Sequence, residues 1–444
     1  MGSESSDIVF KPLKRDPPEI HSSKKKKKRS RVNFQGDEFV KETGLNPFES
    51  RQDTIIKIRG HAEVTSSNII MRAPLIEIYG DDSHLAWAKG PVELKDKKSG
   101  AVLSANEALY IRSENRAVMR GRAKLVYTPR NKNAKTARTT VTLNASEIDR
   151  HFDVSESEAL GNVTATDGKA VFYAKKARFI ERENLIESDS EPRIFVDQDL
   201  FYSDKMNWQT DKNIARFTGN VRAYFSAQNG QNKRAVSSTD TSAVKAGKGE
   251  LVMKDDPAEQ VIILEKNVSI ERKDFAATAD KANIKGAGGD VIKGFGRVFL
   301  HNKVDRTQSR GDYLEFVKET GFGELSANKG NTTQTILFDK KNQPQSELYA
   351  MRLTRATTHA HPQARGNVVL KQVGTKGDTA RDQGNLGSEW AEIRQDEKLI
   401  QFYGRPYVEG KVGRVYAREI ILYYEEARFE MSGISTGQVL GVDK

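Results

Sequence analysis

The sequence predicts an all-β protein, an elongated solenoid of short antiparallel strands built from repeats of about 30 residues. A glycine followed two positions later by Val or Ala recurs along the chain, and the copies at Gly60, Gly90 and Gly121 are 30 and 31 residues apart. A second pattern, exemplified by Leu103-Ser-Ala-Asn-Glu, places an apolar residue two positions before an alanine that a polar pair follows. Because one such unit cannot bury its apolar face alone, stacked copies are expected to share an interior.

Each repeat is expected to contain two short strands, the first opened by glycine and the second by small residues. The Gly-x-Val/Ala pattern begins at Gly60, Gly90, Gly121, Gly161, Gly219, Gly296 and Gly366. Pairs such as Gly219-Asn220, Glu114-Asn115 and Glu183-Asn184 are predicted to form the turns, because Asn and Gly tolerate a positive φ. Apolar residues rarely keep the helical spacing of three and four, which argues against a helical repeat.

Alternation assigns the two faces of each predicted strand. In Gly219–Tyr224, Val221 and Ala223 share one side, and Arg222 and Tyr224 share the other, since successive side chains on a strand point in opposite directions. The same rule predicts that Lys124 points outward. The inward positions of all repeats are called the interior strip: Val92, Leu94, Leu103, Ala105, Ala123, Leu125, Leu143, Ala145, Val163, Phe172, Ala174, Val221, Ala223, Val298, Leu300, Val368 and Leu370.

Composition narrows the classes of protein and of site. Hydrophobic residues make up 36% of the chain, which is below the usual ~45–50% and suits a thin body with much surface. The chain has no cysteine, which excludes thiolate metal sites, disulfides and a lipid-modified cysteine. No window has the ~18–20 consecutive apolar residues of a membrane-spanning helix.

Residues 1–50 differ from the rest, and the repeat domain is expected at 51–444, with a break near 226–248 if it has two segments. Lys24 to Lys28 is an unbroken lysine run, and Pro12, Pro17 and Pro18 precede it. This composition predicts a disordered basic tail. Attraction to an anionic membrane surface and nucleic-acid or nuclear-import binding are the alternatives. No apolar stretch typical of a secretory signal follows the lysines.

Catalytic and metal motifs are weak. Gly433-Ile-Ser-Thr-Gly437 fits the G-x-S-x-G pattern, but that site needs a histidine later in the chain and none follows Ser435. His359 and His361 would share a strand face without an evident third ligand, so a solvated pair is favoured over a metal site. No phosphate-binding or dinucleotide fingerprint is present. We therefore expect no catalytic residues, no metal and no cofactor, and predict that the protein is not an enzyme.

The alternation of G-N-V-x-apolar with L-x-A-x-x-A, over about 60–430, resembles the OstA-like repeat of the LptA family of lipopolysaccharide-transport bridge proteins. The resemblance implies an antiparallel β-jellyroll or β-taco whose apolar interior holds acyl chains while the phosphorylated head of the glycolipid stays outside. The interior strip would then be the lipid-binding groove. The resemblance also implies a periplasmic location and a part in outer-membrane biogenesis. This chain departs from the family in its greater length, its polybasic tail and the lack of a visible signal peptide.

The two ends of a strand stack are expected to pair with other chains, because exposed edges do so unless they are blocked. The predicted edge strands carry Ile55, Ile56 and Ile58 at one end and Ile420, Ile421, Leu422 and Tyr423 at the other. Expected partners are lipopolysaccharide or a related glycolipid, other OstA-like components at the edges, and further copies of this chain joined head to tail.

Other functions remain open at this point. They are a scaffold β-solenoid without lipid cargo and a polysaccharide-cleaving β-helix enzyme. No nucleic-acid partner is expected, because the lysine run lacks interleaved aromatic residues for base stacking.

Overall fold

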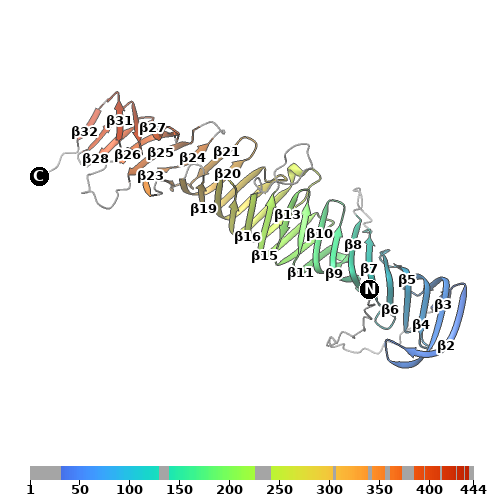
Figure 1. Ribbon diagram of the computed structural model, residues 1–444. Coiled ribbons are helices and arrows are strands. Elements are labelled where there is room, and N and C mark those ends of the chain that lie inside the picture. The colour runs from blue at the N-terminus through green and yellow to red at the C-terminus, as the bar shows by residue number, and fades with distance from the viewer. Residues whose placement is uncertain are drawn as a thin grey trace, which may run out of the picture. The chain divides into compact units, whose positions relative to one another are not determined.

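The computed structural model describes residues 32–129, 140–225, 242–303, 307–338, 343–355, 361–372, 385–394, 396–410, 413–426, 428–434 and 436–439. The chain forms two compact units. Unit 1 comprises the described residues up to Gly168 together with Lys175–Asn184, and unit 2 comprises Lys169–Ala174 and the described residues from Leu185 onward. Both units are built from antiparallel strands (Figure 1), which confirms the predicted all-β class.

In unit 1, each strand from β3 to β8 pairs antiparallel with the next one along the chain. The elements are β1 (Asn33–Gln35), β2 (Glu38–Asn46), β3 (Arg51–Thr65), β4 (Ile69–Tyr79), β5 (Leu85–Asp96), β6 (Val102–Ile111), β7 (Arg116–Tyr127), β8 (Val141–His151), β9 (Glu156–Thr166) and the 3-10 helix η1 (Glu181–Glu183). Strand β10 (Ala170–Ile180) has residues in both units.

Unit 2 has runs of short strands and runs of long ones, and β15 to β20 are six long strands in succession. Its elements are β11 (Leu185–Ser190), β12 (Arg193–Val196), β13 (Asp199–Tyr202), β14 (Lys205–Gln209), β15 (Ile214–Phe225), β16 (Ser242–Val252), the 3-10 helix η2 (Pro257–Glu259), β17 (Val261–Glu271), β18 (Phe275–Lys285), β19 (Val291–Asn302), β20 (Thr307–Val317), β21 (Phe322–Ser326), β22 (Thr333–Phe338), β23 (Pro344–Ala350), β24 (Arg352–Arg355), β25 (Gln363–Gln372), β26 (Asn385–Arg394), β27 (Leu399–Tyr403), β28 (Tyr407–Gly410), β29 (Gly413–Tyr416), β30 (Glu419–Tyr423), β31 (Arg428–Ser432) and β32 (Thr436–Val439). Among the described residues, no helix is long and apolar enough to cross a membrane.

The repeated glycine bends a long strand in its middle and does not open a short one, so that part of the prediction was wrong. In β15, Gly219 and Asn220 have φ of 76° and 44°, and the register with β16 shifts between Thr218 and Val221. Two consecutive residues with positive φ create a bulge that kinks the strand and redirects it. The predicted turns at Asn115 and Asn184 do have positive φ, at 46° and 49°.

The bend at Gly219 also requires the small size of glycine. A Cβ added at Gly219 would lie 2.4 Å from Asp204 Oδ2, and Asn220 donates a hydrogen bond to the same oxygen at 2.8 Å. The same arrangement places Asp280 against Gly296. Asp280 follows the alanine of the second sequence pattern, so the polar residue of that pattern occupies the bend of the neighbouring strand.

Because the strands bend, each contributes to two walls that face a common interior. Ala364 and Leu370 lie on opposite sides of the bend in β25, yet both belong to one buried apolar cluster. Phe201 of β13 stacks on Phe217 of β15 with ring centroids 5.5 Å apart, although β13 pairs with the other half of β15, at residues 222–224. The core of unit 2 therefore lies between the walls.

The strands begin earlier in the chain than composition predicted. Strands β1 and β2, within residues predicted to be tail, pair with the two halves of β3. The lysine run lies outside the described residues. Residues 226–241 also lie outside them, but β15 and β16 on either side pair directly, and the division between the units falls nearer to 168–185.

Candidate functional site

The predicted interior strip faces inward. All of its members are buried except Leu300, which is partly exposed. Arg222 and Lys124, predicted to point outward, are exposed. In unit 1, Leu94, Leu103 and Leu125 each have 0% exposure, so there the strip fills the core. The face assignment is thus confirmed, while contact with lipid stays a prediction.

Leu300 is partly exposed because it borders a cavity of about 440 Å³ inside unit 2. Its apolar lining comes from both walls: Phe275, Leu300, Leu314, Phe316, Leu325, Leu353 and Ile393. Gly323 also lines it, and a Cβ added there would meet no atom within 4 Å. The space is within the ~300–1,000 Å³ range of small-molecule sites.

The strand register explains why the cavity is at this place. Along one wall, Leu300 pairs with Ser309, Ser309 with Thr335, and Thr335 with Leu348. The neighbouring inward positions carry leucine, whereas Ser309 and Thr335 are small and hydrogen-bond to each other at 3.0 Å. Two short side chains in a row of leucines leave the volume unfilled. The repeat pattern gave no sign of the cavity, because Ser309 and Thr335 are 26 residues apart in sequence and become neighbours only when β20 and β22 pair.

Charged groups surround the apolar lining. Arg272, Lys318 and Arg355 border the cavity, together with Asp274 and Glu324. The Arg272 guanidinium lies 5.0 Å from the centre of the Phe316 ring and pairs with Asp274 at 3.2 Å. The surroundings therefore combine an apolar interior with more cations than carboxylates, which suits an amphiphile with an anionic head.

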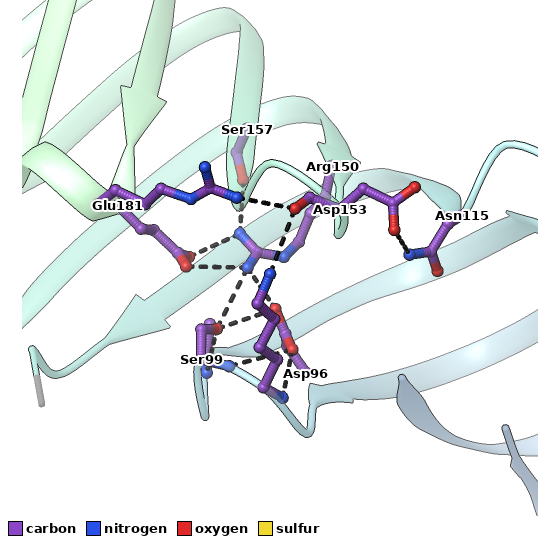
Figure 2. Close-up of polar contacts among 10 residues, drawn as sticks. Asp96, Ser99, Asn115, Arg150, Asp153, Ser157 and Glu181 are labelled. Carbon is purple, nitrogen blue, oxygen red and sulfur yellow. Dashed lines mark hydrogen bonds and ion pairs between the residues drawn. The ribbon is translucent and has the colours of Figure 1, made fainter. Parts of the chain in front are cut away.

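A second polar centre, unforeseen from sequence, is buried in unit 1 (Figure 2). Arg150 of β8 is 0% exposed and contacts Asp96 at 2.6 Å and Glu181 at 2.6 and 3.0 Å. Ser157 accepts a further hydrogen bond from it at 3.0 Å. Asp96 is at the end of β5, Arg150 is on β8, Ser157 is on β9 and Glu181 is in η1. The cluster therefore connects segments that are distant in sequence.

The cluster has one positive charge for two carboxylates, because the single Arg150 guanidinium pairs with both Asp96 and Glu181. Burial raises the pKa of Glu181 above its ordinary value, against the opposing charge of Arg150. Burial also acts to raise the pKa of Asp96, but the hydrogen bonds and charge of Arg150 outweigh it, so that pKa is lowered. No cavity residue belongs to the cluster, and we interpret it as structural.

In the part of the chain that the structure describes, two groups of His, Asp and Glu side chains bring their ligand atoms within 4.8 Å of one another. The first group is Glu49, Asp53 and His84, and its Glu49 carboxylate also pairs with Arg51 at 2.8 Å, so a protein cation already compensates it. In the second, His361 lies 3.7 Å from Asp396. His359 and Ser435 lie outside the described residues.

The predicted edge strands are not edges. The strand with Ile55, Ile56 and Ile58 is β3, which pairs with β2 on one side and β4 on the other. The strand with Ile420, Ile421, Leu422 and Tyr423 is β30, which pairs with β27 and β31. The prediction failed because β1 and β2 precede the first recognisable repeat and β31 and β32 follow the last. Within the described residues, β2 and β31 lie nearer the ends, with Phe39 and Phe429 exposed.

Comparisons of the sequence with known proteins identify no relative. No family model matches the chain. No curated protein matches it either. Among solved structures, the chain is similar to LptH from Pseudomonas aeruginosa, described as the LptA-homologous periplasmic component of the lipopolysaccharide transport device. The similarity has 14% identity and a TM-score of 0.23, over 30% of this chain and 84% of LptH. A likeness of this size decides nothing about the function of this chain.

Proposed function

We propose that the chain binds the acyl chains of a glycolipid, of the class to which lipopolysaccharide belongs, and carries it as part of a transport bridge between membranes. The observation that carries the proposal is the cavity of about 440 Å³ between the walls of unit 2. If sealed and empty, an apolar space of this size would cost on the order of 10 kcal/mol, which is comparable with the whole stability of a domain. Solvent or a ligand must therefore occupy it.

The lining suits a lipid with a polar head. Seven of its twenty residues are leucine, phenylalanine or isoleucine, which offer water none of the two to four polar partners it needs, and ten others are polar or charged. Each methylene transferred from water to such a wall contributes about 0.8 kcal/mol. Arg272, Lys318 and Arg355 would attract a phosphorylated head group. The repeat pattern of the sequence supports the same cargo, a periplasmic location and OstA-like partners at the ends of the stack.

A cavity-filling substitution tests the proposal. Gly323→Leu projects a side chain into the open space beside Gly323, and we expect loss of the lipid that copurifies from a lipopolysaccharide-producing host, measured by mass spectrometry. Gly410→Leu is the matched control, because a Cβ there also meets no atom within 4 Å and Gly410 does not line the cavity. Equal lipid content in both variants and the parent would refute a cavity-bound cargo.

A photo-crosslinker locates the lipid directly. Placed at Leu300, which lines the cavity, it should capture lipid. Placed at His301, the next residue along β19 and on the opposite face, it should not. Capture at His301 alone would place the lipid outside the walls.

A scaffold without cargo is the second candidate. It is favoured by the interior of unit 1, where Leu94, Leu103 and Leu125 leave no exposed surface. A purified chain free of lipid, with an unaltered melting temperature after addition of lipopolysaccharide, would support it.

A further inference from the structure

The outer face of unit 2 carries a patch of aromatic and basic residues on five neighbouring strands. One cross-strand row is Tyr173, Arg193, Tyr202, Arg222 and Lys245, on β10, β12, β13, β15 and β16 in turn. The adjacent row contains Phe195, Leu200 and Tyr224. We call these eight residues the aromatic-basic patch. Its inward neighbours, such as Ile194, Phe201 and Ala223, are buried, so the patch points away from the core.

The cations of the patch lack compensating carboxylates. Arg193, Arg222 and Lys245 are exposed and form no ion pair among the described residues. On the other wall, by contrast, Arg216 of β15 pairs with Glu250 of β16 at 2.8 Å. On the next two strands, Lys281 of β18 pairs with Glu265 of β17 at 3.1 Å. Uncompensated cations on one face create a positive potential that favours an anionic partner.

The aromatic rings engage one another edge to face. Tyr173 and Phe195 have ring centroids 5.7 Å apart at 79°, and Tyr202 and Tyr224 are 6.0 Å apart at 89°. The Arg193 guanidinium lies over the Tyr173 ring at 5.1 Å. Stacking of nucleic-acid bases needs open ring faces, which this packing reduces. Tyrosines with an apolar body and a polar tip instead suit the boundary between lipid and water.

We propose that the aromatic-basic patch docks unit 2 on an anionic membrane surface, with the tyrosines at the headgroup boundary and the basic residues against lipid phosphates. The proposal concerns the outer face and does not depend on the cavity. A sheet face is broad enough to place all three cations against one planar surface. Each basic residue near such a surface strengthens partitioning about fivefold, which gives reversible attachment.

The test measures binding of the full chain to vesicles of phosphatidylcholine with and without phosphatidylglycerol. Arg193→Gln/Arg222→Gln should weaken binding to the anionic vesicles roughly 30-fold. The matched control is Lys95→Gln/Lys124→Gln, which removes the same charge from exposed lysines of unit 1 and should leave binding nearly unchanged. Equal loss in both variants would show that only net charge matters and would overturn the proposal.

A tryptophan probe separates the patch from the basic tail. Tyr224→Trp, at a position 37% exposed, should be quenched by brominated phosphatidylglycerol vesicles, whereas Lys124→Trp should not. If Trp at 224 stays unquenched while the chain is vesicle-bound, attachment is through another segment and the proposal fails. In that case an acidic protein surface would be the partner to test next. Circular dichroism and melting temperature verify that each variant is folded.

Discussion

Replacing Arg150 with methionine should destabilise unit 1 more than any surface substitution. The variant leaves Asp96 and Glu181, exposed by 0% and 2%, facing one another without a cation. Removing one partner from a buried ion pair typically costs about 3–5 kcal/mol, because the remaining charge is desolvated and unpaired. For a domain of 150–250 residues, that corresponds to a fall in melting temperature of roughly 6–20 °C.

The assay should report on unit 1 specifically, because two units need not unfold together. Hydrogen exchange at backbone amides of β7 and β8, compared with those of β25 and β26 in unit 2, provides this resolution. We expect faster exchange in β7 and β8 only.

A compensated variant completes the test. Arg150→Met/Asp96→Asn/Glu181→Gln removes the stranded charges and should recover part of the lost stability, since an apolar or neutral replacement of a buried ionic cluster is often tolerated. If Arg150→Met alone costs less than about 1 kcal/mol, or if the triple variant is the less stable of the two, the electrostatic reasoning is wrong.

Three further predictions concern other parts of the chain. Glu181→Gln should remove a pH dependence: the folded pKa of Glu181 is raised, so its contribution to stability is present below the ordinary carboxyl pKa and lost as pH rises through the folded value. The free energy of unfolding of the parent, relative to that of the variant, should therefore fall as pH rises from the ordinary carboxyl pKa through the folded pKa of Glu181. Phe201→Ala should cost about 3–5 kcal/mol, because Phe201 is fully buried and packs on Phe217 and Phe225. Asn220→Val should cost about 1–2 kcal/mol, because a β-branched residue must adopt φ of 44°.

Chemical denaturation measures the last two, with Thr218→Val, also on β15, as the control for Asn220. A Phe201→Ala variant within 1 kcal/mol of the parent would mean that the walls close over the lost ring. An Asn220→Val variant as stable as the control would mean that the bend does not depend on the left-handed conformation. A pH profile of Glu181→Gln that parallels the parent would remove Glu181 as the titrating group.

Sequence predicted the strand class and the faces because both depend on local chemistry. Alternation fixes which side chain points inward wherever one face is buried, and the positions of Val221 and Arg222 follow from it. The repeated glycines do have the positive φ that their sequence pattern suggested, but they lie in the middle of long strands and not at strand starts. Two residues such as Gly219 and Asn220 can form a turn or a bulge, and only pairing with the next strand decides between them.

The ends, the cavity and the Arg150 cluster depend on contacts that no local pattern encodes. Strand β2 has no repeat signature, so the stack was predicted to begin at β3. The cavity arises because Ser309 of β20 and Thr335 of β22 become neighbours when these two strands pair, although β21 separates the strands in the sequence. Arg150 meets Asp96 and Glu181 only after the turns fold together, and in sequence each is an ordinary charged residue.

The bent strands have a mechanical consequence. Where one strand runs through both walls, as β15 does, the spacing of the walls is fixed by covalent backbone. On one side β20 pairs through its two halves with separate short strands, β21 and β22, as β15 does with β13 and β14. Between β20 and the continuous strand β25, the short strands β21 and β24 form one wall and β22 and β23 form the other. The cavity borders β20, β21 and β22, so it lies where two separate sets of short strands, and not one bent backbone, set the spacing of the walls.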